Sequence, residues 1–287
     1  MDVRNNAIKP SRELAVGGLK IGGTGPLFLI SGPCVIESKE VTIKTAWFLK
    51  ELGQRIGVPI IFKSSFDKAN RTSVDSFRGP GLHEGLKVLK EVKDLTGLPI
   101  VSDIHQVSEI QTAAEILDMI QIPAFLSRQT DLIVEAAKTR LPLNIKKGQF
   151  LSPWDMEQVA SKAKSGGNSS ILLTERGASF GYHNLIVDMR SIAVMKGFGY
   201  PVVFDATHSV QLPGGQGTSS GGQREFVAPL ARAAIAAGAD GIFLEIHPDP
   251  GSALCDGPNS LPLKDVEPLL LMLKEIHLVV GRSRAVG

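Results

Sequence analysis

The sequence has little that would point to a disulfide framework or a nucleic-acid partner. It contains only two cysteines, Cys34 and Cys255, in 287 residues, which excludes a disulfide-rich scaffold and favours a reducing setting. Trp and Tyr occur only twice each, so binding of single-stranded nucleic acid by base stacking is disfavoured. The formal net charge of +2 is too small for binding of nucleic acid or anionic membranes through overall charge.

Long apolar runs and several common motifs are also missing. No apolar stretch is long enough to span a bilayer, and the N-terminal stretch MDVRNNAIKPSRELAVGG lacks the apolar core of a signal peptide. No G-x-G-x-x-G follows the first predicted strand, and no CxxC or HExxH spacing occurs. We therefore expect a cytoplasmic protein with neither a membrane nor a nucleic-acid partner.

What the sequence does contain is a regular alternation of two kinds of segment. Short runs rich in Val, Ile, Leu and Phe end in charged or hydroxyl residues, as buried parallel strands do when their carboxyl ends open into a site. These predicted strands cover residues 28–36, 59–65, 99–104, 119–124, 142–147, 171–176, 201–207 and 241–247. Segments with helical spacing lie between them, for example 39–57, 81–97, 106–117 and 225–238. The alternation predicts an α/β fold, a (β/α)8 TIM barrel with residues 1–287 as a single domain; an open doubly wound sheet is the alternative.

Two segments lie outside this alternation. Residues 1–27 precede the first strand and contain Gly-rich turns, so we expect an N-terminal β-hairpin that closes the bottom of the barrel. Residues 212–223, LPGGQGTSSGGQ, are too polar and too rich in Gly to pack a core. We expect them to form a mobile loop after the seventh strand, where they could cover the catalytic face.

Positively charged side chains gather at the carboxyl ends of the predicted strands, where TIM-barrel enzymes carry their sites. They are Lys63, Lys68, Arg71, Arg128, Lys146 and Arg176. Because like charges repel at a low-dielectric mouth, cations from four different strands imply anionic ligands such as phosphoryl groups. Lys146 could instead form a Schiff base, as in aldolases, but its cationic neighbours favour phosphate binding.

A second group of side chains comes from strands that are neighbours in a closed barrel. Cys34, His208 and Glu245 come from the first, seventh and eighth predicted strands and their ends, and Asp256 comes from the loop after the eighth. A thiol, an imidazole and carboxylates suit a divalent transition metal such as Fe, Zn, Mn or Co. The same residues could instead form a structural cluster without a metal, in which a buried cysteine lies beside a hydrogen bond between His and a carboxylate. The residues alone do not decide between these two alternatives. We interpret Cys255 as a packing residue, since a Cys34–Cys255 bridge is disfavoured in a reducing compartment.

Several of these strand ends carry motifs of a known family. The segments FLISGPCVIES, FKSSFDKANRTSVDSFRGPGL, IQIPAFLSRQTDL, NIKKGQFLSP, FDATHSVQLPGG and EIHPDPGSALCDGPNSLPL resemble the 3-deoxy-D-manno-octulosonate 8-phosphate synthases, and the match runs from about residue 26 to 275. That family is similar in fold to the short 3-deoxy-D-arabino-heptulosonate 7-phosphate synthases, which use erythrose 4-phosphate and are the alternative function. They usually carry a KPRTS-like segment where this chain has KANRTS.

The resemblance implies a transferase activity. Phosphoenolpyruvate would condense with D-arabinose 5-phosphate and water to give 3-deoxy-D-manno-octulosonate 8-phosphate and phosphate, in lipopolysaccharide precursor synthesis. It also implies that the protein is a homotetramer and that it binds small phosphorylated substrates. A barrel that binds ligands without turnover is a third possibility, but such a protein would not need the full set of charged strand ends.

The resemblance further implies roles for individual residues. Lys68, Lys146 and Arg176 should hold phosphoenolpyruvate, with Lys63 alongside. Asn70 and Arg71 should hold arabinose 5-phosphate, with Ser73 nearby. The remaining expectations are that Gln121 and Asp103 line the site, that Arg128 reaches a phosphate across a subunit boundary, and that the catalytic groups are Lys63, Lys68, Asp103, His208 and Asp256.

Cys34 bears on the metal question, because the family has metal-dependent and metal-independent branches. The metal-independent branch has Asn at the position of Cys34, so the resemblance implies a divalent metal held by Cys34, His208, Glu245 and Asp256. The segment CDGPNS around Asp256 is nevertheless shared with the metal-independent branch. Whether turnover requires the metal is therefore left open by the sequence.

Overall fold

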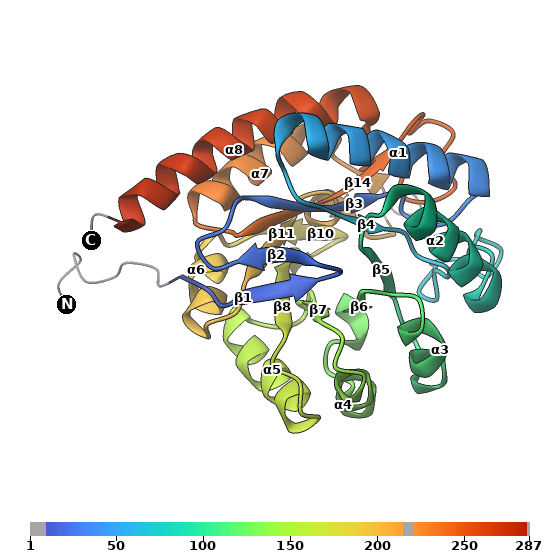
Figure 1. Cartoon of the computed structure of the whole chain (residues 1–287), viewed down its shortest axis with the longest axis horizontal. Helices are drawn as coiled ribbons and strands as arrows, with labels where there is room; N and C mark the ends of the chain where they lie inside the picture. Colours follow the sequence, from blue (N-terminus) through green and yellow to red (C-terminus); the bar gives the residue numbers. More distant parts are fainter. Residues whose placement is uncertain (1–9, 215–220, 286–287) are drawn as a thin grey trace.

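The computed structural model describes residues 10–214 and 221–285. At its centre lie parallel strands in a closed barrel (Figure 1). Within the described residues the eight barrel strands are β3 (Phe28–Gly32), β4 (Ile60–Lys63), β5 (Ile100–Asp103), β6 (Met119–Ile122), β7 (Leu143–Lys146), β8 (Ile171–Glu175), β11 (Val202–Asp205) and β14 (Gly241–His247). The barrel closes because β14 pairs with both β3 and β11. This confirms the predicted (β/α)8 barrel and excludes the open sheet.

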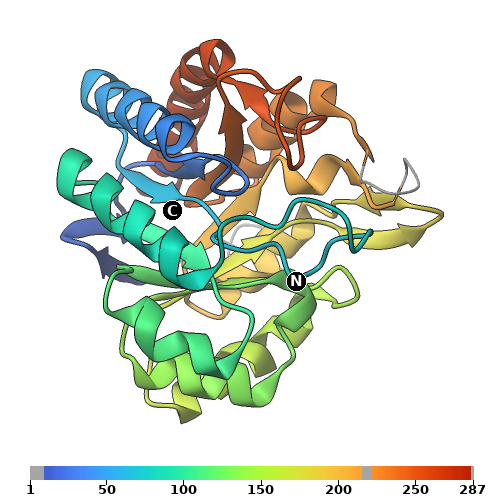
Figure 2. The ribbon, with the colours of Figure 1, turned by 90° about the vertical axis from the view of Figure 1, so that its right-hand side faces the viewer.

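Helices surround the strands on the outside, as Figure 2 shows. They are α1 (Lys39–Ile56), α2 (Leu82–Thr96), α3 (Ile110–Ala114), α4 (Thr130–Lys138), α5 (Met156–Ser165), α6 (Arg190–Gly197), α7 (Val227–Ala236) and α8 (Leu263–Ala285). Apolar side chains of the helices pack against the outward-facing residues of the strands in one continuous core. Within the described part of the chain, no helix is both long enough and apolar enough to cross a membrane.

Helix α1 illustrates how the local sequence sets these boundaries. The side chain of Ser38 accepts a hydrogen bond from the backbone N–H of Val41 and so caps the start of the helix. Gly57 ends the helix in the left-handed conformation, with φ 66°, which glycine adopts at little steric cost. The chain then turns through Val58 into β4, so the cap helps to direct Lys63 to the carboxyl end of that strand.

The N-terminal hairpin consists of β1 (Glu13–Val16) and β2 (Leu19–Gly22), which pair antiparallel. Its buried side chains Leu14, Val16 and Ile21 pack in one cluster with inward-facing barrel residues such as Phe28 and Ile61. The hairpin therefore covers the N-terminal end of the barrel interior, as predicted, although residues 1–9 of the predicted extension lie outside the described residues.

Further short elements lie beyond the barrel strands. After β8, the strands β9 (Ala178–Gly181) and β10 (Asn184–Ile186) form a hairpin at the end of the molecule opposite β1 and β2 (Figure 2). The strands β12 (Gln211–Leu212) and β13 (Gly221–Gly222) pair antiparallel, and β15 (Leu261–Pro262) extends β14. Of the loop expected over 212–223, residues 215–220 lie outside the described residues.

Candidate active site

A pocket of about 370 Å³ opens at the carboxyl ends of the barrel strands. The basic side chains that line it are Lys63, Lys68, Arg71, Lys146 and Arg176, which we call the cation cluster. The walls also include Asp103, Gln121, His208 and Asp256. Most of the residues that the strand-end rule selected therefore share one pocket.

Asp103 and Gln121, which line the pocket, belong to a chain of buried polar side chains that crosses five neighbouring strands. The hydroxyl of Ser65 donates to Asp103 Oδ2 at 3.0 Å, and the amide of Gln121 donates to Asp103 Oδ1. Asn144 in turn donates to Gln121 at 2.9 Å and accepts from Thr174. These hydrogen bonds satisfy polar groups that would otherwise be costly to bury, and they fix the orientation of Asp103 and Gln121.

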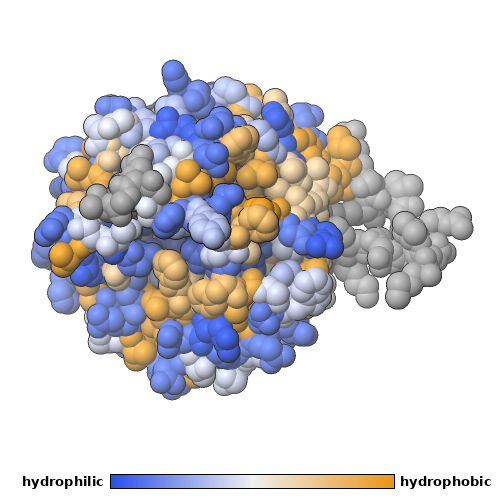
Figure 3. Space-filling model, turned by 180° about the vertical axis from the view of Figure 1, so that it is seen from behind, coloured by the Kyte–Doolittle hydropathy of each residue, from blue (hydrophilic) through white to orange (hydrophobic). Residues whose placement is uncertain are grey.

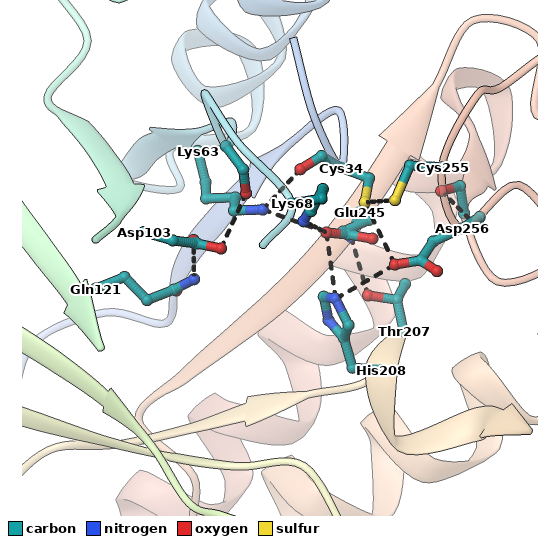
Figure 4. A network of polar contacts seen from close by, with 12 residues as sticks. Cys34, Lys63, Lys68, Asp103, Gln121, Thr207, His208, Glu245, Cys255 and Asp256 are labelled. Atoms are coloured by element: carbon teal, nitrogen blue, oxygen red, sulfur yellow. Dashed lines mark hydrogen bonds and ion pairs between the residues drawn. The ribbon is translucent and has the colours of Figure 1, made fainter. Parts of the chain in front are cut away.

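Glu245 lies among three potential cations. Its Oε1 atom is 3.3 Å from Lys63 Nζ, 3.3 Å from His208 Nε2 and 3.9 Å from Lys68 Nζ (Figure 4). Burial by itself would raise the pKa of Glu245, but His208, Lys63 and Lys68 hold it well below its usual value. Glu245 is therefore a carboxylate at neutral pH and organises the lysines around it.

Asp205, at the end of β11, joins the cation cluster to His208. The ammonium group of Lys146 donates to Asp205 Oδ2, and His208 Nδ1 lies 2.7 Å from the same oxygen. Burial by itself would lower the pKa of His208, but the carboxylates of Asp205 and Glu245 raise it above its ordinary value. Burial also lowers the pKa of Lys146, although Asp205 opposes that change. Asp205 thus places the imidazole of His208 beside a buried lysine.

Arg176 presents a buried guanidinium group to the pocket. Its Nη2 atom donates to Gln211 at 2.9 Å, whereas Nη1 is buried and has no hydrogen-bond partner among the described residues. Burial lowers the pKa of the guanidinium, the expected consequence of removing a charge from water. A buried guanidinium N–H without a partner suits a bound anion, because leaving it unpaired is costly.

The four predicted metal ligands come together, as expected from the neighbouring strands. Asp256 is shared between two groups, Cys34–Cys255–Asp256 and His208–Glu245–Asp256, and in each group the potential ligand atoms lie within 4.8 Å of one another. Asp256 Oδ2 is 3.3 Å from Cys34 Sγ and 3.8 Å from His208 Nε2. Glu245 Oε2 is buried and has no hydrogen-bond partner within residues 10–214 and 221–285.

Two of the predicted substrate-binding residues do not line the pocket. Ser73 lies on the following loop, where its hydroxyl accepts from the backbone N–H of Asp75, while Thr72 and Ser76 line the pocket instead. Arg128 is exposed and outside the pocket, and its carbonyl accepts from Lys162. Within this chain, neither Ser73 nor Arg128 lies in the pocket with the cation cluster.

Two other residues have a larger place in the site than the sequence indicated. Asp205 ends β11 three residues before His208, a position that could have drawn attention to it from the sequence. Cys255 packs beside Cys34 and Val35, as predicted, but it also lines the pocket. Its sulfur lies 2.7 Å from that of Cys34 and accepts from Arg71 Nη1 at 3.0 Å. Cys34 and Cys255 are both free and buried.

The fold and the site together define the class of protein: a TIM-barrel enzyme with a charged pocket at the carboxyl ends of its strands. The chain belongs to the DAHP synthetase I family, whose family model matches residues 4–280.

Curated relatives cover nearly the whole chain. A protein of Geobacter metallireducens is 62% identical over 94% of this chain and 99% of its own length. A protein of Trichlorobacter lovleyi is 60% identical, and one of Geobacter sulfurreducens is 59% identical, each with the same coverage of both chains. All three relatives are named 2-dehydro-3-deoxyphosphooctonate aldolase.

Proposed function

We propose that the protein condenses phosphoenolpyruvate with D-arabinose 5-phosphate and water, giving 3-deoxy-D-manno-octulosonate 8-phosphate and inorganic phosphate. The observation that carries this proposal is the cation cluster at one pocket, together with a buried guanidinium N–H of Arg176 that has no partner among the described residues. Two phosphorylated substrates and one carboxylate bring several negative charges that this cluster would neutralise. The names of the relatives favour the octulosonate over the heptulosonate reaction.

The pocket offers two regions for the two substrates. Lys68, Lys146 and Arg176 are buried, and with Lys63 they would hold the phosphate and carboxylate of phosphoenolpyruvate. Asn70 and Arg71 line the same pocket from the loop after β4, where they would hold the phosphate of the sugar. Asp103 and Gln121 line the pocket from the strand ends between these groups and would contact the reacting ends of both molecules.

For these bond changes the main task of the pocket is to position the two substrates relative to each other. C3 of phosphoenolpyruvate attacks the aldehyde carbon of the sugar, whose oxygen gains a proton, and water adds at C2. The resulting hemiketal phosphate then releases phosphate by cleavage of its C–O bond. Holding two reactants in register contributes up to roughly 7–11 kcal/mol to lowering the barrier. His208, which lies between Asp205 and Glu245, would supply or accept the protons.

The residues around Asp256 fit a divalent metal such as Fe, Zn, Mn or Co. Cys34, His208, Glu245 and Asp256 supply sulfur, nitrogen and oxygen donors, and the orphaned Oε2 of Glu245 is the kind of atom that a cation would satisfy. Such an ion, when bound, acidifies water or polarises a carbonyl group. Asp205 would orient the imidazole of His208 for that role through the contact at Nδ1.

The proposal extends to how the chain is organised and where it works. Residues 1–287 act as one domain of a cytoplasmic homotetramer, in which Arg128 reaches the pocket of a neighbouring subunit. Arg128 is exposed, and so are the large apolar side chains of Phe125 at 51%, Phe150 at 56% and Phe180 at 73%. Figure 3 shows the face opposite the N-terminal hairpin, on which apolar and hydrophilic residues intermingle. Exposed apolar groups on such a face support assembly through it.

The experiment that tests the reaction is an incubation with phosphoenolpyruvate and arabinose 5-phosphate, with inorganic phosphate measured and the organic product weighed by mass spectrometry. We expect one phosphate released for each eight-carbon product formed. Failure to release phosphate with any pair of phosphoenolpyruvate and an aldose phosphate would instead favour a binding protein without turnover. Inactivation by borohydride in the presence of substrate would favour a Schiff base at Lys146, whose lowered pKa is the observation that makes this rival worth testing.

A further inference from the structure

We propose that Cys255 is a second sulfur ligand of the metal, so that the site selects a thiophilic divalent ion such as Zn²⁺. This inference rests on the metal site of the proposed function and adds a ligand to it. Cys255 is 4% exposed, and its sulfur points at the sulfur of Cys34, which in turn contacts the carboxylate of Asp256 (Figure 4).

The geometry places two sulfurs and a carboxylate around one point. Cys34 Sγ is 2.7 Å from Cys255 Sγ and 3.3 Å from Asp256 Oδ2, and the ligand atoms of the three residues all lie within 4.8 Å of one another. The two sulfurs are farther apart than the roughly 2.05 Å of a disulfide bond, and both cysteines are free. Two buried thiols that face the same carboxylate form a donor set that can close on one cation.

The loop that carries Cys255 is anchored so that neighbouring residues reach the same site. Asp256 has a φ of 51°, in the left-handed region that a non-glycine residue enters only at some cost. The backbone N–H of Leu254, the residue before Cys255, donates to Glu37 Oε1 at 2.7 Å. This hydrogen bond holds the Cys255 loop to the loop after β3. The unusual backbone at Asp256 thus lets both its carboxylate and the preceding sulfur face Cys34.

The basic side chain that contacts Cys255 is that of Arg71. Arg71 Nη1 donates to Cys255 Sγ at 3.0 Å, and Nη2 donates to the carbonyl of Leu254 at 2.9 Å. A guanidinium beside a metal-bound sulfur offsets its negative charge. Because soft sulfur donors favour Zn²⁺ over the hard ions Mg²⁺ and Mn²⁺, a second thiol would narrow the choice of metal.

Cobalt(II) is a suitable probe, because sulfur ligands give cobalt a charge-transfer absorption that grows with their number. Wild type, Cys255→Ser, Cys34→Ser and the double variant are stripped of metal, reduced and titrated with Co²⁺. We expect each single variant to show about half the charge-transfer absorbance per bound cobalt, because one of two sulfur donors is lost, and the double variant to show none. Zn²⁺ should also bind Cys255→Ser at least about tenfold more weakly than wild type.

Controls separate a ligand from a structural residue. Ser252→Ala removes an exposed hydroxyl from the same loop, where it bonds only the carbonyl of Asp249, and should leave the cobalt spectrum unchanged. Melting temperatures show whether each variant folds, and Cys255→Ala serves as the second variant if Cys255→Ser does not. Thiol titration of the unfolded wild-type protein should find two free thiols.

The proposal is wrong if Cys255→Ser keeps the full absorbance and zinc affinity while Cys34→Ser loses them. It is also wrong if Ser252→Ala loses absorbance as Cys255→Ser does, or if reduced wild type still lacks free thiols. These outcomes are independent of the proposed reaction, which is judged by phosphate release from phosphoenolpyruvate and arabinose 5-phosphate.

Discussion

At the scale of single residues, Asp205 shows how one buried carboxylate organises a site. Its Oδ2 atom contacts both Lys146 and His208, while Oδ1 accepts from the backbone N–H of His208 at 2.9 Å. The contact at Nδ1 leaves His208 Nε2 facing Glu245 and Asp256. Asp205 therefore decides which imidazole nitrogen faces the other proposed metal ligands.

Replacing Asp205 by Asn keeps the shape of the side chain and removes its charge. We expect Asp205→Asn to lower kcat by roughly 10–100-fold, because both Lys146 and His208 lose their orienting partner. Steady-state phosphate release measures this. Asp188→Asn is the matched control, since Asp188 pairs with Arg190 at the surface and does not line the pocket. Equal losses in the two variants would contradict the role of Asp205.

The same carboxylate predicts an acid dependence of stability. Burial by itself would raise the pKa of Asp205, but His208 and Lys146 hold it well below its ordinary 3.8. Its contribution to stability is therefore present above pH 3.8 and is lost as the pH falls below that value. Urea unfolding of wild type and Asp205→Asn from neutral to acidic pH measures this, and wild type should lose more stability. Parallel curves for the two proteins would contradict it.

Arg71 is the residue that should separate the two substrates. Arg71→Ala removes a charge-assisted hydrogen bond to the sugar phosphate, about 1.5–3 kcal/mol, so KM for arabinose 5-phosphate should rise roughly 10–100-fold. KM for phosphoenolpyruvate should change much less. Arg78→Ala is the control, because Arg78 pairs with Asp67 and does not line the pocket. An equal rise of both KM values would show that Arg71 does not bind the sugar.

Most of the pocket could be predicted from the sequence, because TIM barrels place their functional residues at the carboxyl ends of strands. Lys63 and Lys146 end β4 and β7, so their positions followed from the strands themselves. Ser73, Arg128 and Cys255 lie in longer loops, where the sequence does not specify the path of the chain. The contact between Cys255 and Cys34 therefore could not be read from spacing.

At the scale of elements, the barrel depends on the N-terminal hairpin as well as on its strands. Ile21 is fully buried in the cluster that fills the bottom of the barrel. The sequence predicted this hairpin from its Gly-rich turns. It also predicted strands longer than those observed, such as 28–36 against Phe28–Gly32, because apolar residues continue past the last backbone pairing into the loop that carries Cys34.

Shortening the side chain of Ile21 to that of alanine tests the structural role of the hairpin. We expect Ile21→Ala to lower the free energy of unfolding by about 2–5 kcal/mol, through lost burial and the cavity left behind. Guanidinium denaturation measures the loss. Lys20→Ala, which removes only an exposed ion pair with Glu13, should cost at most about 1 kcal/mol. A similar small loss for Ile21→Ala would mean that the hairpin does not stabilise the barrel.

At the scale of the whole molecule, the closed barrel brings the first and last strands together. Glu245 on β14 lies opposite Gly32 on β3, next to the loop that carries Cys34. Residues more than two hundred positions apart in the sequence thus meet at Asp256. Arg128 remains outside the pocket of its own chain, which is why the proposed assembly assigns it to a neighbour.

Mixing of subunits tests that assignment. Arg128→Ala and Arg176→Ala should each be nearly inactive alone, but co-refolded mixtures should regain activity. In a randomly mixed tetramer about a quarter of the pockets would combine an intact Arg176 with a neighbour's intact Arg128. Phosphate release before and after mixing measures the recovery. No recovery, despite mixed tetramers detected by native mass spectrometry, would place Arg128 outside the site.

The central claim is that this pocket recognises a five-carbon sugar phosphate beside phosphoenolpyruvate. The most direct measurement is kcat/KM for arabinose 5-phosphate and for erythrose 4-phosphate, determined side by side by phosphate release at saturating phosphoenolpyruvate. The account predicts a clear preference for arabinose 5-phosphate with an eight-carbon product. A preference for erythrose 4-phosphate with a seven-carbon product would contradict it.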